Sequence, residues 1–446
     1  LADGVVNADG LHCPWHHALF DLETGEARHA PAIGPLGCWA VEQRDGKVFV
    51  GEKQDPAERR TPRQKGPDHI VIVGGGAAGF AAAEMLRRQG YKRNLIMLSN
   101  DSAGPVDRPN LSKDYLAGKA PEEWVPLRGD DFYTENEIDL RLETTVAAIN
   151  PGAHEIVLSN GAPLAYDRLL LATGAEPNPP AVPGGDLPHV RLLRSLADCR
   201  AIIDRLPKTR RAVVLGASFI GLEVAAALRE RGIEVHVVAP EQRPMEKILG
   251  TALGDFIRKL HEEHGVVFHL AATARQIDEK QVTLADGSRL DADLVVAGLG
   301  VRPRIALAEQ AGLALDRGLK VDAFLETSAP GIFAAGDIAR WPDPHSGENI
   351  RVEHWVVAER QGQVAALNLI GEGRAFTAVP FFWSQHYDIP INYVGHAAAW
   401  DAIDIEGSID NRDCLMRYKQ GGRVKAVASI FRDRESLQAE IAMEKD

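Results

Sequence analysis

The chain has 446 residues, of which 45% are hydrophobic and 25% charged. A chain of this length and composition is expected to fold into two to four domains, which excludes a disordered protein and a single small module. Lysine and arginine number 50 against 63 aspartates and glutamates, and the resulting net charge of −13 argues against nucleic acid as a partner.

Signals for membrane insertion and secretion are absent from the sequence. No run approaches the roughly 18 apolar residues of a membrane helix, and the first ten residues, LADGVVNADG, lack the basic and apolar regions of a signal peptide. The four cysteines are too few and too scattered for a disulfide framework, which favours a reducing compartment. We therefore expect a cytoplasmic protein without a membrane partner. Because the chain begins with Leu1 rather than Met, we also expect further residues upstream.

The beginning of the chain has the signals of a small all-β domain. Asp-Gly turns occur at 9–10 and 45–46, and the second is flanked by the strand-like runs CWAVEQ and KVFVGE, which predict a hairpin. The next stretch, DPAERRTPRQKGP, is charged and contains prolines without an apolar period, as a linker does. We expect an N-terminal domain at residues 1–54 and a linker at 55–67.

From residue 69 onward, a pattern of apolar strand, glycine cluster and amphipathic helix occurs twice. The two copies are HIVIVGGGAAGFAAAEMLRRQG at 69–90 and RAVVLGASFIGLEVAAALRERG at 211–232. This spacing is that of a duplicated domain, and the strand-to-helix turn is typical of doubly wound nucleotide-binding folds. We expect an α/β protein with two Rossmann-like domains. Near residue 376 the sequence becomes aromatic and β-rich, which predicts a separate C-terminal α+β domain.

The first glycine cluster has the pattern Gly74-x-Gly76-x-x-Gly79, with Ala77 and Ala78 between its last two glycines. Gly74 permits the tight turn, Gly76 lets a pyrophosphate approach the backbone, and Gly79 lets the helix pack close to the strand. Amide donors at the start of the helix would face the phosphates. This motif alone is weak evidence, because a glycine-rich turn can be purely architectural.

The second cluster, Gly216-x-Ser218-x-x-Gly221, occurs in the same context, with a serine in place of the middle glycine. Two such turns on one chain predict two bound nucleotides. Redox enzymes need this arrangement when one cofactor passes electrons to the other.

A carboxylate about 20 residues beyond each cluster is expected to bind a ribose hydroxyl. The candidates are Asp101 after the first cluster and Glu241 after the second. Glu241 favours NADH, because a carboxylate repels a 2′-phosphate. Arg243, two residues later, could instead accept that phosphate, so NADPH is the alternative.

Four further strings, in this order along the chain, resemble those of the flavin-dependent pyridine-nucleotide oxidoreductases. They are DRPNLSKDYL (107–116), LLLATGAEPNPP (169–180), GSRLDADLVVAGLGVRPR (287–304) and ETSAPGIFAAGD (326–337). Within that family, the chain is most similar to the ferredoxin reductases of bacterial oxygenase systems and to apoptosis-inducing-factor-like proteins fused to a Rieske domain. The resemblance covers nearly the whole chain.

This resemblance implies a domain plan. The FAD-binding domain would comprise two segments, the NAD(P)H-binding domain would be inserted between them, and a reductase domain would end the chain. The corresponding ranges are 68–180 and 301–375 for FAD, 181–300 for NAD(P)H and 376–446 for the C-terminal domain.

The resemblance also implies roles for individual residues around the flavin. Arg108 would lie near the FAD phosphates, which a bidentate cation suits, and Asp337, after Gly336, would accept a hydrogen bond from a ribityl hydroxyl. The chain would leave the FAD domain at Ala172, Thr173 and Gly174. For the Gly-Asp pair, the simpler reading is an ordinary turn.

The proposed chemical pair is Lys113 and Glu223. In the family, such a lysine lies beside flavin N5, where a cation stabilises the reduced flavin, and the glutamate orients it. Trp383 resembles the tryptophan near the flavin face towards which a carrier protein docks. His354 and Trp355 resemble the segment that begins the helix covering the flavin ring. The simpler interpretations are a surface lysine and an exposed helix glutamate for the pair, and core residues for the aromatic side chains.

The N-terminal domain contains CPWHHALFD at 13–21, which resembles the second ligand loop of a Rieske domain. Cys13 and His16 would then bind the two irons of a [2Fe-2S] cluster, although a zinc pair or chance spacing is as simple a reading. A cluster needs two further ligands, normally from an upstream CxH loop, which this sequence lacks. We expect the cluster only if the intact protein supplies that loop, and the Rieske centre would then be an acceptor in cis.

The sequence thus predicts an enzyme that moves electrons from NADH or NADPH through FAD to a one-electron iron–sulfur acceptor, either a Rieske centre or a ferredoxin. A cysteine-based disulfide reductase or peroxidase is disfavoured, because no cysteine occurs between Cys38 and Cys199. The alternatives are a redox-controlled binding protein similar to apoptosis-inducing factor and a quinone or monodehydroascorbate-type reductase. The protein would act as a monomer or homodimer.

Overall fold

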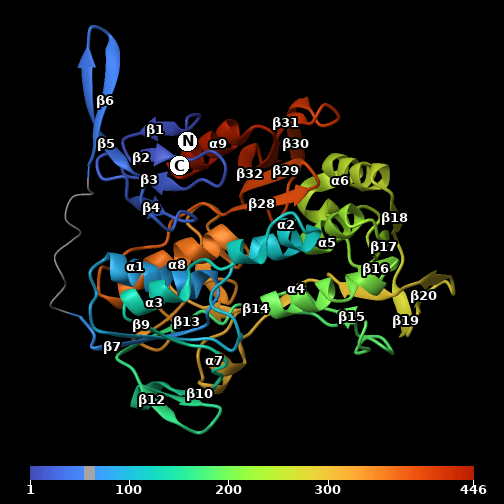
Figure 1. The fold of residues 1–446 in the computed structure, drawn as a ribbon, viewed down its shortest axis with the longest axis horizontal. Coiled ribbons are helices and arrows are strands. Elements are labelled where there is room, and N and C mark those ends of the chain that lie inside the picture. The colour runs from blue at the N-terminus through green and yellow to red at the C-terminus, as the bar shows by residue number, and fades with distance from the viewer. Residues whose placement is uncertain (55–65, 446) are drawn as a thin grey trace.

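The structure is a computed structural model, and it describes residues 1–54 and 66–445. Most of the predicted linker, residues 55–65, lies outside the described residues. Figure 1 shows a mixed α/β protein in which two parallel sheets with their helices are joined by an antiparallel C-terminal sheet and a small N-terminal β-domain. The predicted fold class is confirmed.

The N-terminal domain is built from short antiparallel strands. Four of them form one sheet in chain order, namely β1 (Val5–Asn7), β2 (Gly10–His12), β3 (Leu19–Phe20) and β4 (Ala27–His29). The predicted hairpin is confirmed, since β5 (Cys38–Arg44) and β6 (Lys47–Gln54) pair around the Asp45–Gly46 turn. This hairpin is largely exposed and projects away from the remainder of the domain (Figure 1).

The first Rossmann-like unit contains a five-stranded parallel sheet. In spatial order its strands are β25 (Ile332–Ala334), β13 (Arg168–Leu171), β7 (His69–Val73), β8 (Asn94–Leu98) and β9 (Ile138–Arg141). Residues of β7 and β13 are almost all buried, as expected for strands covered on both faces. Helices α1 (Ala77–Arg88) and α8 (Trp355–Leu369) lie side by side, although their first residues are 278 positions apart in the sequence (Figure 1).

The pairing of α1 with α8 brings the beginning and the end of the first unit together, because the second unit is inserted between them in the sequence. The first unit also contains the short helices α2 (Asp114–Ala117), α3 (Asp130–Glu135) and α7 (Ala306–Gln310). Two small sheets complete it. They are β10 (Val146–Asn150), β11 (Glu155–Leu158) and β12 (Pro163–Ala165), and β24 (Leu319–Lys320), β26 (Ala339–Pro342) and β27 (Asn349–Ile350).

The second Rossmann-like unit repeats this plan. Its parallel sheet consists, in spatial order, of β15 (Val190–Arg191), β22 (Leu294–Ala297), β16 (Arg211–Leu215), β17 (Glu234–Val238) and β18 (Val266–His269). Its helices are α4 (Leu196–Ile203), α5 (Phe219–Glu230) and α6 (Glu246–Glu263). A small sheet of β19 (Ala274–Asp278), β20 (Gln281–Leu284) and β21 (Arg289–Asp291) covers one side.

The chain passes between the two units through a pair of short strands. β14 (Ala175–Pro177) leads out of the first unit, β23 (Val301–Pro303) leads back, and the two pair antiparallel. This crossover places the second unit next to the carboxyl ends of the first sheet, which is where α/β folds bind their ligands.

The C-terminal domain is an antiparallel sheet with one helix. In spatial order its strands are β28 (Phe381–His386), β29 (Ile389–Gly395), β32 (Arg423–Ile430), β31 (Asp413–Gln420) and β30 (Ala402–Ser408), and α9 (Asp433–Met443) follows. A turn at Gly421–Gly422 joins β31 to β32. Part of this sheet shares a hydrophobic core with the second unit, and Tyr418 Oη donates a hydrogen bond of 2.9 Å to Leu249 O.

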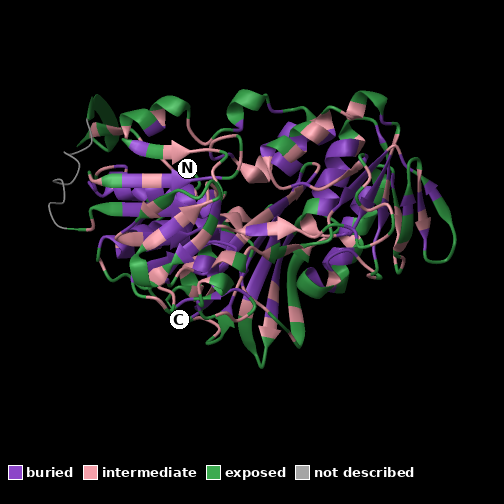
Figure 2. Cartoon of the chain, turned by 90° about the horizontal axis from the view of Figure 1, so that it is seen from below, coloured by how far each residue is buried: buried purple, intermediate pink, exposed green. Residues whose placement is uncertain are grey.

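Buried residues are concentrated in the sheets and in the helices that pack on them, as Figure 2 shows. In the part of the chain that the structure describes, no helix has both the length and the apolar character needed to cross a membrane.

Candidate functional site

Most of the predicted site residues meet in two cavities near the first glycine turn. The larger, of about 530 Å³, is lined by residues of both Rossmann-like units and of the C-terminal domain. The smaller, of about 340 Å³, lies over the turn itself. The two cavities share the four lining residues Gly76, Arg108, Ala172 and Arg194, so together they form one elongated site.

The structure distributes the predicted residues as follows. The larger cavity is lined by Gly76, Ala77, Ala78, Arg108, Lys113, Ala172, Gly174, Glu223, Gly336, Asp337, His354, Trp355 and Trp383. The smaller cavity adds Gly74, Asp101 and Thr173. Neither cavity is lined by Gly79, Gly216, Ser218, Gly221 or Glu241.

The first glycine turn is too tight for any side chain. Gly74 has φ of 123°, and a Cβ atom there would lie 2.1 Å from the carbonyl oxygen of Ala172. Gly79 lies in the first turn of α1, where a Cβ atom would lie 1.9 Å from Gly74 O. These contacts hold the start of α1 against β7, so its unpaired amide groups face the cavity, as anion binding requires.

The second glycine turn has the same geometry with one difference. A Cβ atom at Gly216 would lie 2.3 Å from Gly298 O. Ser218 is the N-cap of α5, since its Oγ accepts a hydrogen bond from Gly221 N (3.2 Å) and donates one to Gly298 O (2.9 Å). The serine therefore holds the helix start in place where the other turn has a glycine.

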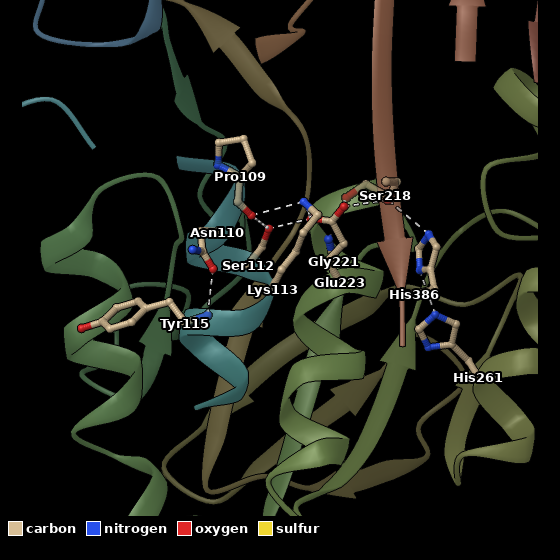
Figure 3. A network of polar contacts seen from close by, with 11 residues as sticks. Pro109, Asn110, Ser112, Lys113, Tyr115, Ser218, Gly221, Glu223, His261 and His386 are labelled. Atoms are coloured by element: carbon tan, nitrogen blue, oxygen red, sulfur yellow. Dashed lines mark hydrogen bonds and ion pairs between the residues drawn. The ribbon is translucent and has the colours of Figure 1, made fainter. Parts of the chain in front are cut away.

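Lys113 and Glu223 are brought together as predicted. Lys113 follows a short 3-10 helix in the first unit, Glu223 lies on α5 of the second, and Lys113 Nζ is 2.8 Å from Glu223 Oε2. The carboxylate is buried and also accepts hydrogen bonds of 2.6 Å from Ser112 Oγ and Ser384 Oγ (Figure 3). Burial by itself would raise the pKa of Glu223, but Lys113 and these hydrogen bonds outweigh it and lower the pKa below its ordinary value.

Two arginines lie where the cavities join. Arg108 Nη2 is 3.1 Å from Asp101 Oδ2, and Arg194 Nη2 is 2.6 Å from Asp337 Oδ2. Burial, together with the neighbouring Arg194, lowers the pKa of Arg108 to about 10, so its guanidinium stays charged at neutral pH. Two cations beside a helix start can bind a pyrophosphate. Sequence reasoning missed Arg194, which follows β15 without any motif to mark it.

The site fits FAD. It is elongated, with a phosphate-binding turn and two arginines at its middle. Arg194 Nε and His354 Nδ1 are buried and have no hydrogen-bond partner among the described residues, so both can serve a ligand. Burial lowers the pKa of His354 to about 3, so the imidazole is neutral.

Aromatic side chains form the wall of the larger cavity that the C-terminal domain contributes. Phe382 and Trp383 come from β28, and Trp355 begins α8. The rings of His354 and Phe382 lie 4.5 Å apart. Such a wall can cover a flavin ring. These aromatic residues line the cavity, so they are not simply core residues.

The N-terminal domain contacts this wall through its CPWHH loop. The ring of His16 lies 4.5 Å from that of Trp383, and the ring of His17 stacks on Phe381 at 4.0 Å. His17 also forms a buried ion pair with Glu440 of α9. Glu440 in turn lies 2.6 Å from Arg360 Nη1 of α8, whose Nη2 donates to His17 O at 2.9 Å.

The predicted metal ligands form only part of a cluster site. Cys13 is half-buried and a free thiol, and burial lowers the pKa of His16 to about 4, which keeps its imidazole neutral, as a ligand must be. However, no group of three or more potential ligand side chains gathers anywhere within residues 1–54 and 66–445. A [2Fe-2S] cluster needs four ligands, so the residues present do not fit one, and no electron-transfer step is assigned to the N-terminal domain.

Glu241 and Arg243 follow β17 but lie outside both cavities. The carbonyl oxygen of Glu241 accepts a hydrogen bond of 2.9 Å from Ala271 N. Arg243 is held by two acidic side chains of α6, with Nε 2.8 Å from Asp255 Oδ1 and Nη1 3.3 Å from Glu246 Oε1.

Neither cavity is lined by a cysteine among the described residues. Cys199 lies on α4 of the second unit and is buried, with its Sγ 3.2 Å from Leu111 O. Burial raises the pKa of this thiol to about 12, so it is not a thiolate nucleophile at neutral pH.

Together, the fold and the site define a flavin- and pyridine-nucleotide-dependent oxidoreductase. Residues 68–362 match the family model "Pyridine nucleotide-disulphide oxidoreductase", and residues 1–40 match the model "Rieske [2Fe-2S] domain". The chain belongs to the pyridine nucleotide-disulphide oxidoreductase family.

Individual relatives refine this assignment. The chain is 31% identical to apoptosis-inducing factor 3 of Homo sapiens, over 97% of this chain and 74% of the relative. It is 37% identical to a putidaredoxin reductase of Pseudomonas putida, over 83% and 90% of the two chains. Its structure is similar to that of the reductase in a covalent putidaredoxin reductase–putidaredoxin complex, with a TM-score of 0.82, 35% identity and coverage of 85% and 94%.

Proposed function

We propose that this protein is an FAD-dependent reductase that takes hydride from NADH and passes single electrons to an iron–sulfur acceptor. The observation that carries this proposal is the Lys113–Glu223 ion pair, which joins the two Rossmann-like units inside the larger cavity. Relatives named as ferredoxin–NAD⁺ reductase components support it. One of them, from the anthranilate 1,2-dioxygenase system of Burkholderia cepacia, is 38% identical over 81% of this chain and 91% of its own length.

The first unit would hold FAD. The amides after Gly74 and the guanidinium groups of Arg108 and Arg194 would bind its pyrophosphate, and Asp101 and Asp337 would accept hydrogen bonds from its sugar and ribityl hydroxyls. The flavin ring would lie beside Lys113 in the larger cavity. When bound, FAD accepts two electrons as hydride and releases them one at a time.

The protein's own residues would position the reactants and exclude water. Lys113 would place its ammonium group beside the flavin, where a cation favours added negative charge, and Glu223 would fix that ammonium group in place. The start of α5, capped by Ser218, would bind the pyrophosphate of NADH. The hydride transfer needs no protein base, so these groups act through orientation and charge.

The side of the cavity formed by Trp383 would be the exit for electrons. It is the wall against which His16 of the N-terminal domain packs. The proposed acceptor is an iron–sulfur protein or domain that meets this wall. A related putidaredoxin reductase has been captured in a covalent complex with putidaredoxin, which supports an acceptor of this class.

The proposed donor is NADH rather than NADPH. Arg243 is the residue that the sequence offers for binding a 2′-phosphate. Its guanidinium group is already paired with Asp255 and Glu246. We further propose that the protein works in the cytoplasm, since its four cysteines are free thiols, as expected for a reducing compartment.

The proposed function is tested by anaerobic titration of the FAD-loaded protein with NADH, followed by addition of an oxidised [2Fe-2S] ferredoxin. NADH is expected to bleach the flavin absorbance, and the ferredoxin is expected to restore it within seconds. A flavin that NADH reduces but that reoxidises only slowly would instead favour a redox-controlled binding protein. Direct, fast reoxidation by a quinone without any ferredoxin would favour the quinone-reductase alternative.

A further inference from the structure

The Lys113–Glu223 pair is the inner end of a longer chain of buried polar groups. Ser384 Oγ is 2.6 Å from Glu223 Oε1 and 3.2 Å from His386 Nε2, and His386 Nδ1 is 3.1 Å from His261 Nε2. Ser384, His386 and His261 are each completely buried. Figure 3 shows the two histidines extending the network away from Lys113.

Three elements supply the chain of groups from Glu223 outwards, and the first of them is α5, which holds Glu223. Ser384 and His386 lie two residues apart on β28, so they share one face of that strand, opposite the face of Trp383. His261 lies in the last turn of α6. A continuous buried polar chain across three elements is costly unless its members satisfy one another, which makes it a specific feature of this fold.

The hydrogen bonds fix the direction in which the chain is polarised. Because Glu223 is ionised, Ser384 donates its proton to it, and Ser384 must then accept from His386 Nε2–H. His386 Nδ1 consequently accepts from His261 Nε2–H. This leaves His261 Nδ1 as a bare acceptor, and it is buried without a partner among the described residues. Every donor therefore points towards Glu223, the polarity needed to pass a proton inwards.

Reduction of the flavin adds one negative charge to the cavity, and a proton is needed to balance it. With oxidised flavin, the positive Lys113 and the negative Glu223 cancel. Hydride transfer breaks the nicotinamide C4–H bond, forms the flavin N5–H bond and leaves one negative charge on the flavin. A proton on Glu223 would restore neutrality, because Lys113 would then be paired with the reduced flavin alone.

We propose that His261, His386 and Ser384 form a proton path that delivers one proton from solvent to Glu223 when the flavin is reduced. This rests on the proposed function, since it requires FAD beside Lys113. The proton enters at His261 Nδ1. The Nε2 proton of His261 moves to His386 Nδ1, that of His386 Nε2 moves to Ser384, and that of Ser384 moves to Glu223. When the electrons leave, the same groups return this proton, because the chain is then polarised outwards.

The surroundings of the chain are suited to this role. The ionisable groups that act on it are Lys113 at the Glu223 end and His264 at the His261 end. His261 lies near the end of α6, and the exposed His264 follows it three residues later, so the chain of groups ends beside an exposed part of the fold. Burial lowers the pKa of His386 to about 4, so it is neutral at rest and can both donate and accept.

The test is stopped-flow mixing of FAD-loaded protein with NADH, without oxygen, in weakly buffered solution containing a pH-indicator dye. Hydride transfer alone takes up no proton. The wild-type protein is expected to take up about one proton per flavin bleached, and the infrared spectrum of the reduced protein is expected to show a protonated carboxyl band. In Glu223→Gln, both the uptake and this band should be lost.

The outer part of the path is tested by His386→Phe, with Ser384→Ala as a second interruption in case the first variant does not fold. In either variant, the rate of proton uptake should be at least tenfold lower than the rate of flavin bleaching. The matched control is His236→Phe, since His236 forms a similar histidine pair with His269 that is not part of the proposed proton path. In this variant, proton uptake should proceed at the rate of flavin bleaching. Full bleaching without proton uptake in the wild-type protein would overturn the path but not the proposed function. Absence of bleaching would overturn both.

Discussion

The ring of His16 lies 4.5 Å from the ring of Trp383, which joins the N-terminal domain to the wall of the flavin cavity. This contact links residues 367 positions apart, and a buried polar cluster lies beside it. That cluster consists of His17, Glu440 and Arg360, all of which are buried. The N-terminal domain is therefore attached to the remainder of the protein through α8 and α9.

We expect Glu440→Ala to loosen the N-terminal domain. The change leaves the buried guanidinium group of Arg360 without its carboxylate partner, and removing one member of a buried ion pair typically costs about 3–5 kcal/mol. The control is Glu435→Ala, because Glu435 is an exposed carboxylate on the same helix. Limited proteolysis should release the domain faster from the first variant only. Equal cleavage rates in both variants would contradict a role for Glu440 in seating the domain.

Lys113→Ala is expected to bind FAD but to be reduced slowly by NADH. The ammonium group stabilises negative charge that develops on the flavin, and loss of one such interaction typically slows a reaction about 10²- to 10³-fold. Stopped-flow measurement of flavin bleaching at saturating NADH gives the rate. Lys119→Ala is a suitable control, since Lys119 forms an exposed ion pair outside the cavity. A wild-type rate in Lys113→Ala would remove Lys113 from the mechanism.

Gly74→Ala is expected to abolish FAD binding. The new methyl group would lie 2.1 Å from Ala172 O. The alanine would also have to keep the backbone φ of 123°, which residues with a side chain rarely adopt. Gly152→Ala is the control, because a Cβ atom there meets no other atom within 4 Å. The ratio of flavin to protein absorbance after purification measures the effect. Normal FAD content in Gly74→Ala would place the cofactor elsewhere.

The preference for NADH is expected to depend on Glu241 and on the pairing of Arg243. Glu241→Ala should weaken NADH more than NADPH. Replacing Asp255 and Glu246 together by alanine should free the Arg243 guanidinium and improve the use of NADPH. The quantity to compare is the ratio of kcat/KM for the two nucleotides. If the ratio stays constant in all of these variants, selectivity is set by other residues.

Stability is expected to decrease as the pH falls from about 6.5 towards 4. His354 and His386 are completely or largely buried, and burial lowers their pKa values to about 3 and about 4. In this range the unfolded chain binds protons at both sites while the folded protein does not, so acid favours unfolding. Each site contributes at most about 3 kcal/mol. His386→Phe should reduce the slope of chemical-denaturation stability against pH, and an unchanged slope would contradict this.

Much of the fold could be predicted because its signals are local. Each glycine cluster follows an apolar strand and begins a helix, so the two Rossmann-like units can be recognised from short segments. The pairing of Lys113 with Glu223 came from family resemblance rather than from spacing. Arg194 has no local signal in the sequence, because it lies in a loop after the two-residue strand β15.

Other features could not be predicted because they depend on tertiary contacts. The N-cap role of Ser218 is local, but its second hydrogen bond goes to the carbonyl group of Gly298, 80 residues away. Ser384 reaches Glu223 from another domain, and His261, which contacts His386 on the strand of Ser384, belongs to a third element. The CPWHH loop indicates ligands, but only the structure shows that His16 packs on Trp383.

The central claim is that FAD beside Lys113 receives electrons from NADH and releases them singly to an iron–sulfur acceptor. The most direct measurement is rapid mixing of NADH-reduced, FAD-loaded protein with an oxidised [2Fe-2S] ferredoxin, in which the flavin and the ferredoxin absorbances are followed together. We expect two ferredoxins to be reduced for each flavin reoxidised, at matching rates. Protein that binds no FAD, or reduced flavin that leaves the ferredoxin oxidised, would contradict the claim.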